Sequence, residues 1–254
     1  MAKRSTIAVA LILIAVFFVL GLLNVLLHDS QDSSETSPPP SQAPQTQPSS
    51  SQASDADTTI VLIIGVDEVN STHPQLQSLW VAALINRNEY ITLHGLSIGI
   101  QPRHENGATF SELFDASPET GPSSQFLDAV QRTTHLEPDL IIVLDAEGFA
   151  KGIDYVGGVE VDGTTIDGQR VLAFLDGYAA NHDLALDAQA GILEAILPNV
   201  AALRQPIELT PLTSLVPEHA HLSTDITTAA AMLVPSLPIQ AESVFLILTH
   251  STDP

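Results

Sequence analysis

Residues 139–178 read DLIIVLDAEGFAKGIDYVGGVEVDGTTIDGQRVLAFLDGY and carry most of the information about the fold class. The apolar run 139–144 is typical of a strand that is buried on both faces, as in the centre of a covered sheet. A short helix is expected over 146–155, and Gly157 and Gly158 end it because glycine accepts the left-handed conformation found after helices. A strand followed directly by a helix predicts an α/β unit.

The second half of this stretch predicts a hairpin and another helix. Residues 159–166 alternate around Asp162-Gly163, a dipeptide typical of tight hairpin turns. Asp167 is then expected to cap a helix that runs to about Tyr178, because an aspartate oxygen accepts hydrogen bonds from the first backbone N–H groups of a helix.

The remaining elements follow from the same patterns. We expect strands over 59–66, 79–85, 90–98 and 244–249, and helices over 125–134, 184–203 and 224–233. Pro198 is expected to interrupt the second of these helices, and Ser223 or Thr224 to cap the third. Trp80 and Phe174 are expected in the core. Strands separated by helices predict an α/β or α+β sandwich, with a mixed central sheet flanked by helices.

The N-terminal part predicts a membrane anchor. Residues 7–27 read IAVALILIAVFFVLGLLNVLL, and about 20 apolar residues are enough to cross a bilayer as a helix. Lys3 and Arg4 precede them, so the positive-inside rule places residues 1–6 in the cytoplasm. A cleaved signal peptide is the alternative, but its apolar region is shorter, about 7–15 residues, and ends in a small-x-small site that is missing after Leu27. We therefore expect a single-pass protein of the cell membrane with its domain outside.

Residues 28–57 predict a disordered linker. They are rich in Ser, Gln, Thr and Pro and have almost no apolar side chains, so they cannot bury enough surface to offset the entropy of the chain. Three prolines at 38–40 stiffen the segment. The linker would hold the extracellular domain, residues 58–254, away from the bilayer.

The composition limits the partners of that domain. The chain has eight basic and 30 acidic residues and a net charge of −22, and two of the basic residues, Lys3 and Arg4, precede the membrane segment. Such an acidic surface repels nucleic acid, so no nucleic-acid partner is expected. The absence of cysteine excludes disulfides, thiolate catalysis and zinc–thiolate sites.

Three stretches, 61–68, 91–98 and 141–174, match the motifs of a known family. The third contains IIVLDAEGFAKGIDYVGGVEVD and continues through IDGQRVLAF, which is similar to the family pattern VD-x-x-GF-x-x-x-VD-x-x-GGV-x-V followed by LDG-x-x-AL-x-Y. Over about 58–203 the chain thus resembles the LytR–CpsA–Psr family of cell-envelope proteins.

The resemblance implies an architecture and a chemistry. Family members have a short cytoplasmic N-terminus, one span and an extracellular α/β domain. That domain transfers anionic glycopolymers from a polyprenyl-pyrophosphate carrier to peptidoglycan, with the help of a divalent metal such as Mg²⁺. The implied partners are the membrane, a polyprenyl-phosphate lipid and a cell-wall glycopolymer.

The chain departs from the family at charged positions. By the resemblance, Ser78 stands where the family has a metal-holding aspartate, Ile100 and Gln101 replace an arginine and an acid, and Asp176, Tyr178, Ala185 and Ala188 fall near four arginine positions. Gln189 remains from the family's Arg-Gln pair, and Arg170 is the one basic residue of its predicted helix and is expected to pair with a nearby acid. These two are the candidate substrate-binding residues.

The losses predict that catalysis is gone. Pyrophosphate chemistry needs fixed positive charge where negative charge builds up, from arginine or a metal ion. A guanidinium group binds phosphate in a two-pronged fork that apolar side chains cannot imitate. Each such contact is worth about 2.7–4 kcal/mol, so losing several should abolish turnover. No catalytic residue and no resident cofactor or metal are therefore expected, whereas Mg²⁺ would be needed if the chain were an active transferase.

Two other groups could bind a cation. His219 and His221 would point the same way in an extended segment, but the sequence supplies no third or fourth ligand, so an exposed polar loop is the simpler interpretation. The acids at 67–68 could gather with Asp145 and Glu147 at strand ends as a divalent-cation site, although chance grouping is expected at this density of acids.

Three hypotheses follow. The first is a non-catalytic lipid- or glycopolymer-binding or scaffolding module in cell-envelope assembly, a pseudoenzyme. The second is a divergent active transferase that uses other charged residues, such as Arg103, Arg132 and Arg170. The third is an unrelated anchored structural protein, which the absence of a lipid-sized apolar cavity would favour.

Overall fold

The protein is described by a computed structural model that covers residues 58–85, 90–103, 105–161, 163–201, 215–233 and 243–251. The predicted cytoplasmic segment 1–6, membrane helix 7–27 and linker 28–57 lie outside these residues. Within the described part, no helix has the length and apolar character needed to span a bilayer.

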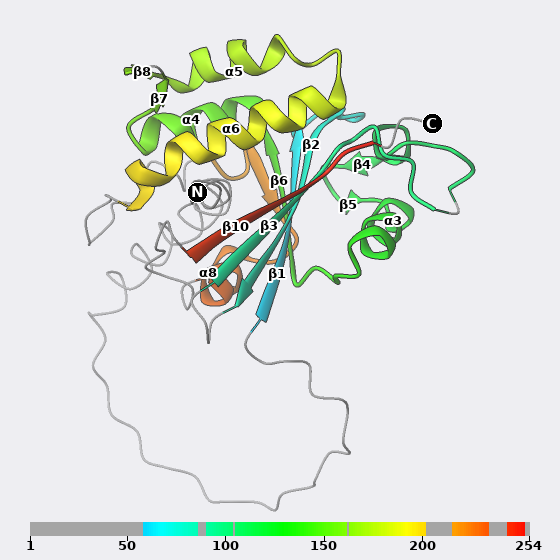
Figure 1. Ribbon diagram of the computed structural model, residues 1–254. Helices are drawn as coiled ribbons and strands as arrows, with labels where there is room; N and C mark the ends of the chain where they lie inside the picture. Colours follow the sequence, from blue (N-terminus) through cyan, green and yellow to red (C-terminus); the bar gives the residue numbers. More distant parts are fainter. Residues whose placement is uncertain are drawn as a thin grey trace, which may run out of the picture.

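A six-stranded mixed sheet forms the centre of the molecule (Figure 1). The strands are β1 (Thr58–Val66), β2 (Leu76–Ile85), β3 (Tyr90–Leu96), β6 (Leu140–Asp145), β9 (Ala220–Leu222) and β10 (Val244–Thr249). Their order is β10-β3-β2-β1-β6-β9. β1 runs parallel to β6, and β3 runs parallel to β10, whereas the other neighbours are antiparallel. The predicted mixed sheet is confirmed.

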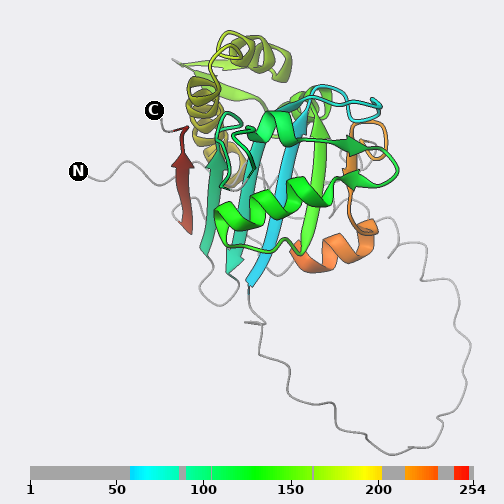
Figure 2. The ribbon, with the colours of Figure 1, turned by 90° about the vertical axis from the view of Figure 1, so that its right-hand side faces the viewer.

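Helices cover both faces of this sheet. They are α2 (Phe110–Leu113), α3 (Ser124–Thr134), α4 (Ala146–Tyr155), α5 (Gly168–Asp176), α6 (His182–Ala201) and α8 (Ile226–Leu233). Helices α4, α5, α6 and α8 pack on one face, and α2 and α3 pack on the other, where α3 crosses in front of the strands in Figure 2. Two short hairpins complete the fold, β4 (Ala116–Ser117) with β5 (Gly121–Pro122) and β7 (Val159–Val161) with β8 (Thr164–Ile166).

The apolar run of β1 serves both layers. Val61 and Ile63 belong to the core on the α4–α6 side, whereas Leu62 and Ile64 belong to the core on the α2–α3 side. All four side chains are buried, as expected for a central strand that is covered on both faces.

The stretch 139–178 folds as its pattern predicts. β6 ends at Asp145, whose Oδ1 accepts a 2.8 Å hydrogen bond from the backbone N–H of Gly148 and so caps α4. Gly157 and Gly158 follow the helix with φ angles of 90° and 88°, which favour glycine. Asp167 caps α5 by accepting from the backbone N–H of residue 170.

Two predictions about helix ends were wrong. Pro198 does not interrupt α6, which continues to Ala201. The proline removes a single backbone donor close to the helix end, and the buried side chains of Leu197 and Val200 hold this last part against the sheet. The cap of α8 is Asp225, not Ser223 or Thr224, because its Oδ1 accepts from two backbone N–H groups of the first turn at 3.0 Å each.

The core assignment of the two aromatic residues is half right. Trp80 is fully buried under α6, as predicted. Phe174 is 43% exposed and was wrongly placed in the core. It lies on the outer side of α5, where its ring meets the ring of Tyr178 edge-on with 5.2 Å between centroids.

Candidate functional site

A cavity of about 870 Å³ opens at the carboxyl ends of β1 and β6. Because these two strands are parallel, Val66 and Asp145 lie side by side at their ends. The cavity extends from there between the sheet and helices α4, α5 and α6, and it reaches α2. Its volume is within the range of about 300–1,000 Å³ that is usual for ligand pockets.

The buried part of the lining is almost wholly apolar. The buried lining residues are Ile63, Val66, Leu76, Trp80, Leu96, Ile98, Leu144, Asp145, Leu186 and Leu193. Partly buried Phe149, Leu172 and Leu175 of α4 and α5 add to this surface. Such a lining favours an aliphatic or isoprenoid chain over a polar ligand, since apolar surface gains from leaving water.

The exposed lining residues form a rim around this apolar interior. The rim consists of Asp67, His73, Gln75, Gln77, Asp176, Ala179 and His182. It carries two carboxylates, whereas neither lysine nor arginine occurs among the described lining residues. The mouth of the cavity is therefore acidic.

The basic residues of the described part lie elsewhere. Arg132 on α3 pairs with Glu105, and Lys151 on α4 lies 3.8 Å from Glu147. Neither Arg103 nor Arg132 belongs to the cavity lining. The arginines named for the transferase hypothesis are therefore not assembled around the cavity.

The two candidate substrate-binding residues have different positions. Gln189 lines the cavity, and its amide makes two hydrogen bonds within the protein: Oε1 accepts from Trp80 Nε1, and Nε2 donates to the carbonyl oxygen of Gln77, both at 3.2 Å. Arg170 is not among the lining residues, and its Nε lies 3.9 Å from an oxygen of Asp167. The expectation that Arg170 pairs with a nearby acid is confirmed.

Some of the positions aligned to the family's charged residues lie together at the cavity, whereas Gln101, Tyr178 and Ala188 are not among its lining residues. Ser78 of β2, Asp176 of α5, and Ala185 and Gln189 of α6 all line it. Ile100 instead packs against the core on the α2–α3 side. The cavity therefore presents a serine, an alanine and a carboxylate where the resemblance implies charged groups for phosphate or metal.

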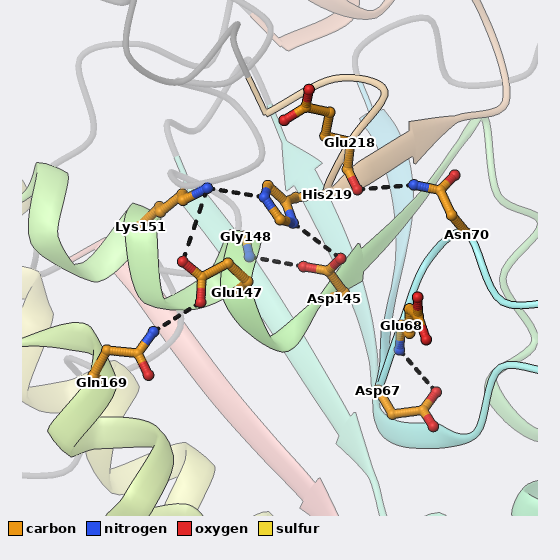
Figure 3. A network of polar contacts seen from close by, with 10 residues as sticks. All are labelled: Asp67, Glu68, Asn70, Asp145, Glu147, Gly148, Lys151, Gln169, Glu218 and His219. Atoms are coloured by element: carbon orange, nitrogen blue, oxygen red, sulfur yellow. Dashed lines mark hydrogen bonds and ion pairs between the residues drawn. The ribbon is translucent and has the colours of Figure 1, made fainter.

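A polar network fixes the end of β6 beside the cavity (Figure 3). Asp145 Oδ2 lies 3.2 Å from His219 Nδ1, and His219 Nε2 lies 2.8 Å from Lys151 Nζ. A lysine ammonium group can only donate, so Nε2 accepts and Nδ1 carries the hydrogen that it donates to Asp145. His219 thereby links α4 and the end of β6 to the segment before β9.

The acids at the predicted cation site already have protein partners. Asp67 Oδ1 accepts from the backbone N–H groups of Glu68 and Gln75 at 2.8 and 2.7 Å. Glu147 Oε2 accepts from Gln169 Nε2 at 2.8 Å. Among the described residues, no group of three or more His, Asp or Glu side chains is placed to hold a metal ion.

The described residues therefore do not fit the divalent metal that the resemblance implies. Ser78 stands at the position of the family's metal-holding aspartate. The two histidines do not form a pair of ligands either. Both ring nitrogens of His219 are engaged, and His221 lies in β9 opposite Val143, lining a separate hollow. The exposed polar loop expected there is wrong in part, because 220–222 form strand β9 on the edge of the sheet.

We expect Asp145→Ala to destabilise the protein by about 2 kcal/mol, because it removes the cap of α4 and leaves His219 without its acceptor. Asp145→Asn retains an oxygen for the cap and should cost less. The measurement is urea unfolding of the full chain followed by circular dichroism. Equal midpoints for Asp145→Ala and the unmodified chain would show that this network does not hold α4 in place.

This chain is similar to known proteins in structure but not detectably in sequence. No family model matches the chain, and no curated protein matches it by sequence. Among solved structures, the transcriptional regulator yvhJ from Bacillus subtilis has 17% identity and a TM-score of 0.58, covering 78% of this chain and 84% of that one. TagV from B. subtilis has 14% identity and a TM-score of 0.58, with 78% and 86% covered. TagT bound to LIIa-WTA has 14% identity and a TM-score of 0.57, with 76% and 79% covered.

At these identities the likeness shows the fold. TagT and TagV are LytR–CpsA–Psr proteins, so the described domain has the fold of that family, as the resemblance of the sequence predicted. This chain is acidic, with a net charge of −22. Its cavity has an apolar interior, and neither lysine nor arginine occurs on the rim among the described residues.

The sequence did not reveal most of the rim. His73, Gln75 and His182 come from separate segments, two from the loop between β1 and β2 and one from the start of α6. Nor did spacing suggest the contact between Asp145 and His219, which are 74 residues apart. The only signal was the position of Asp145 directly after an apolar strand, where polar residues of α/β proteins often gather.

Proposed function

We propose that this protein is a non-catalytic module of cell-envelope assembly that holds the apolar chain of a polyprenyl-type lipid, free or linked to a glycopolymer. The observation that carries the proposal is the cavity of about 870 Å³ with its buried apolar lining. The fold adds support, because TagT, which is similar in fold, has been solved bound to LIIa-WTA and to LI-WTA.

The electrostatics of the cavity argue against transfer chemistry. A transferase acting on pyrophosphate must stabilise negative charge that builds up on phosphate oxygens, which requires arginine, lysine or a metal ion in fixed positions. Asp67 and Asp176 on the rim would oppose such charge instead. Ser78 and Ala185 replace charged groups that the resemblance implies, and Gln189 is bonded within the protein. The apolar lining that would contact a lipid chain is kept, whereas the charged groups that would bind pyrophosphate are not.

The proposed location follows from the sequence. Residues 7–27 would span the cell membrane once, with residues 1–6 in the cytoplasm and the domain 58–254 outside the cell. The linker 28–57 would let the cavity reach lipids in the outer leaflet or the wall polymer beyond it.

An active transferase is the second candidate, and the likeness to TagT bound to LIIa-WTA favours it. It would move a glycopolymer from a polyprenyl-pyrophosphate carrier to peptidoglycan with Mg²⁺. Its weakness is that Arg103, Arg132 and Arg170 do not line the cavity. This candidate would need charge from residues outside the described part.

The two candidates separate in one experiment. The full chain is extracted in a mild detergent, analysed by native mass spectrometry, and its lipids are extracted and identified. We expect one long-chain lipid per protein and no turnover of a polyprenyl-pyrophosphate-linked glycopolymer with or without Mg²⁺. Metal-dependent turnover would establish the transferase. A chain that carries no lipid, even after incubation with polyprenyl lipids, would exclude both and leave an anchored scaffold.

A further inference from the structure

The rim of the cavity should determine which lipid head group can bind there. This inference rests on the proposed lipid-binding function. We propose that the cavity takes a lipid whose head donates hydrogen bonds to the carboxylates of the rim, such as an alcohol or a sugar, and disfavours phosphate and pyrophosphate heads. Three independent features of the described residues carry this proposal: the charges of the rim, the ends of the nearby helices, and the positions of the basic side chains.

The rim is built from hydrogen-bonding groups and negative charge. Asp67 and Asp176 contribute carboxylates, which accept strong hydrogen bonds from hydroxyl groups. Gln75 and Gln77 contribute amides that both donate and accept, and His182 can do either according to its tautomer. A head with hydroxyl groups can both donate to the carboxylates and accept from the amides, whereas a phosphate offers mainly acceptors and meets two like charges.

The helix ends at the cavity offer no anion site. The N-terminus of α4 is capped by Asp145, whose carboxylate occupies the place that an anion would take. The N-terminus of α6 is capped by Asn181, whose Oδ1 accepts from the backbone N–H groups of Asp183 and Leu184 at 3.1 Å each. α5 ends at the rim with Asp176, so its carboxyl end adds partial negative charge at the mouth.

Basic side chains in the described ranges do not neutralise the negative charge of the rim. Lys151 is bonded to His219 and lies near Glu147, and Arg170 lies near Asp167. Neither is among the lining residues. The surroundings do not reverse the sign either, because the whole chain has a net charge of −22. A phosphate head would therefore give up its hydration and its counter-ions without gaining a partner of opposite charge.

The chain contains its own reporter for the test. Trp80 is its single tryptophan, it is fully buried, and it lines the cavity, so its fluorescence should respond when a lipid chain enters. The full chain in mild detergent is titrated with a polyprenol, the corresponding polyprenyl phosphate and the corresponding polyprenylamine, all with the same chain length. We expect the alcohol to bind at least ten times more tightly than the phosphate. Raising the salt concentration should strengthen phosphate binding and leave alcohol binding unchanged, because salt screens repulsion.

A pair of arginine variants tests whether the rim sets this preference. Asp176→Arg places a positive charge on the rim, and Ala173→Arg places the same charge on an exposed part of α5 that does not line the cavity. We expect Asp176→Arg to raise the affinity for polyprenyl phosphate at least tenfold and to lower the affinity for the alcohol, because the carboxylate that accepts from its hydroxyl group is lost. Ala173→Arg should change neither affinity.

The outcomes distinguish this inference from the function on which it rests. If the unmodified chain binds the phosphate as tightly as the alcohol or the amine, the head-group inference is wrong and the lipid-binding function stands. A lack of response to Asp176→Arg would also overturn the inference, because the head would then not lie at the rim. If none of the three lipids binds, both proposals fail.

Discussion

Ala185→Phe should empty the protein of lipid while leaving it folded. Ala185 lies on α6 and lines the cavity, and its side chain is only partly buried, so a phenyl ring can enter the space that a lipid chain would fill. Forcing extra atoms into an occupied site costs about 1–3 kcal/mol, which corresponds to roughly a 5- to 150-fold loss of affinity. We therefore expect co-purified lipid to fall to background in native mass spectrometry and the response of Trp80 to added polyprenol to weaken accordingly.

The control for this prediction is Ala188→Phe. Ala188 is also a partly buried alanine on α6, but it is not among the lining residues of the cavity. Both variants make the same chemical change on one helix, and the difference in helix propensity between alanine and phenylalanine is below about 0.7 kcal/mol. We expect Ala188→Phe to keep its lipid. Loss of lipid in both variants together, or in neither, would contradict the assignment of the cavity as the lipid site.

Residue patterns predicted the fold well wherever local chemistry determines it. The stretch 139–178 encodes its strand, the Asp167 cap, the glycine stop and the hairpin in neighbouring residues, and each of these was confirmed. The errors lie where tertiary packing outweighs local preference. Pro198 stays inside α6 because the apolar side of that helix is held on the sheet. Strand β9 has three residues and depends on pairing with β6, so its sequence alone gives little sign of it.

The candidate site was less predictable because it is assembled from distant segments. The resemblance correctly indicated that positions such as Ser78 and Asp176 belong together, and both line the cavity. Periodicity could not have done so, since they lie on different elements, β2 and α5, that are far apart in the sequence. The role of His219 depends on its contacts with Asp145 and Lys151, whereas the sequence around it favoured an exposed polar loop over a metal site.

The chain keeps the apolar cavity of the fold but has no lysine or arginine among the described residues that line it. The cavity requires a large apolar surface on both the sheet and the helices, and Trp80 shows how tightly that surface is fitted. A Cβ atom on Gly95 would lie 2.6 Å from the Trp80 ring and 2.8 Å from Leu186, so only glycine lets the ring lie flat against β3. Such packing supports a specific cavity, whereas the rim lacks the positive charge that phosphate transfer would need.

The contact between α4 and α5 sets one wall of the cavity, and a single methyl group should disrupt it. A Cβ atom on Gly168, the first residue of α5, would lie 2.0 Å from the backbone oxygen of Ala150 in α4. The two helices therefore touch through their backbones, and the backbone N–H of Gly168 also donates to Asp154 Oδ1 at 2.7 Å. Since backbone atoms cannot swing aside like a side chain, Gly168→Ala must push α5 outward. We expect a loss of about 1–3 kcal/mol in the free energy of unfolding.

Gly191→Ala makes the same change with the opposite expected sign. Gly191 lies inside α6 and is exposed, and beyond the backbone of its own helix no described atom lies within 4 Å of the place that a Cβ atom would occupy. Alanine should therefore stabilise the helix by about 0.5–1 kcal/mol, and urea unfolding should move the midpoints of the two variants in opposite directions. Gly168→Ala should also weaken lipid binding, because Leu172 and Leu175 of α5 line the cavity and would move with the helix. A Gly168→Ala protein as stable as the unmodified chain would mean that α5 does not rest on α4, and that the cavity lacks the wall on which the proposed lipid binding depends.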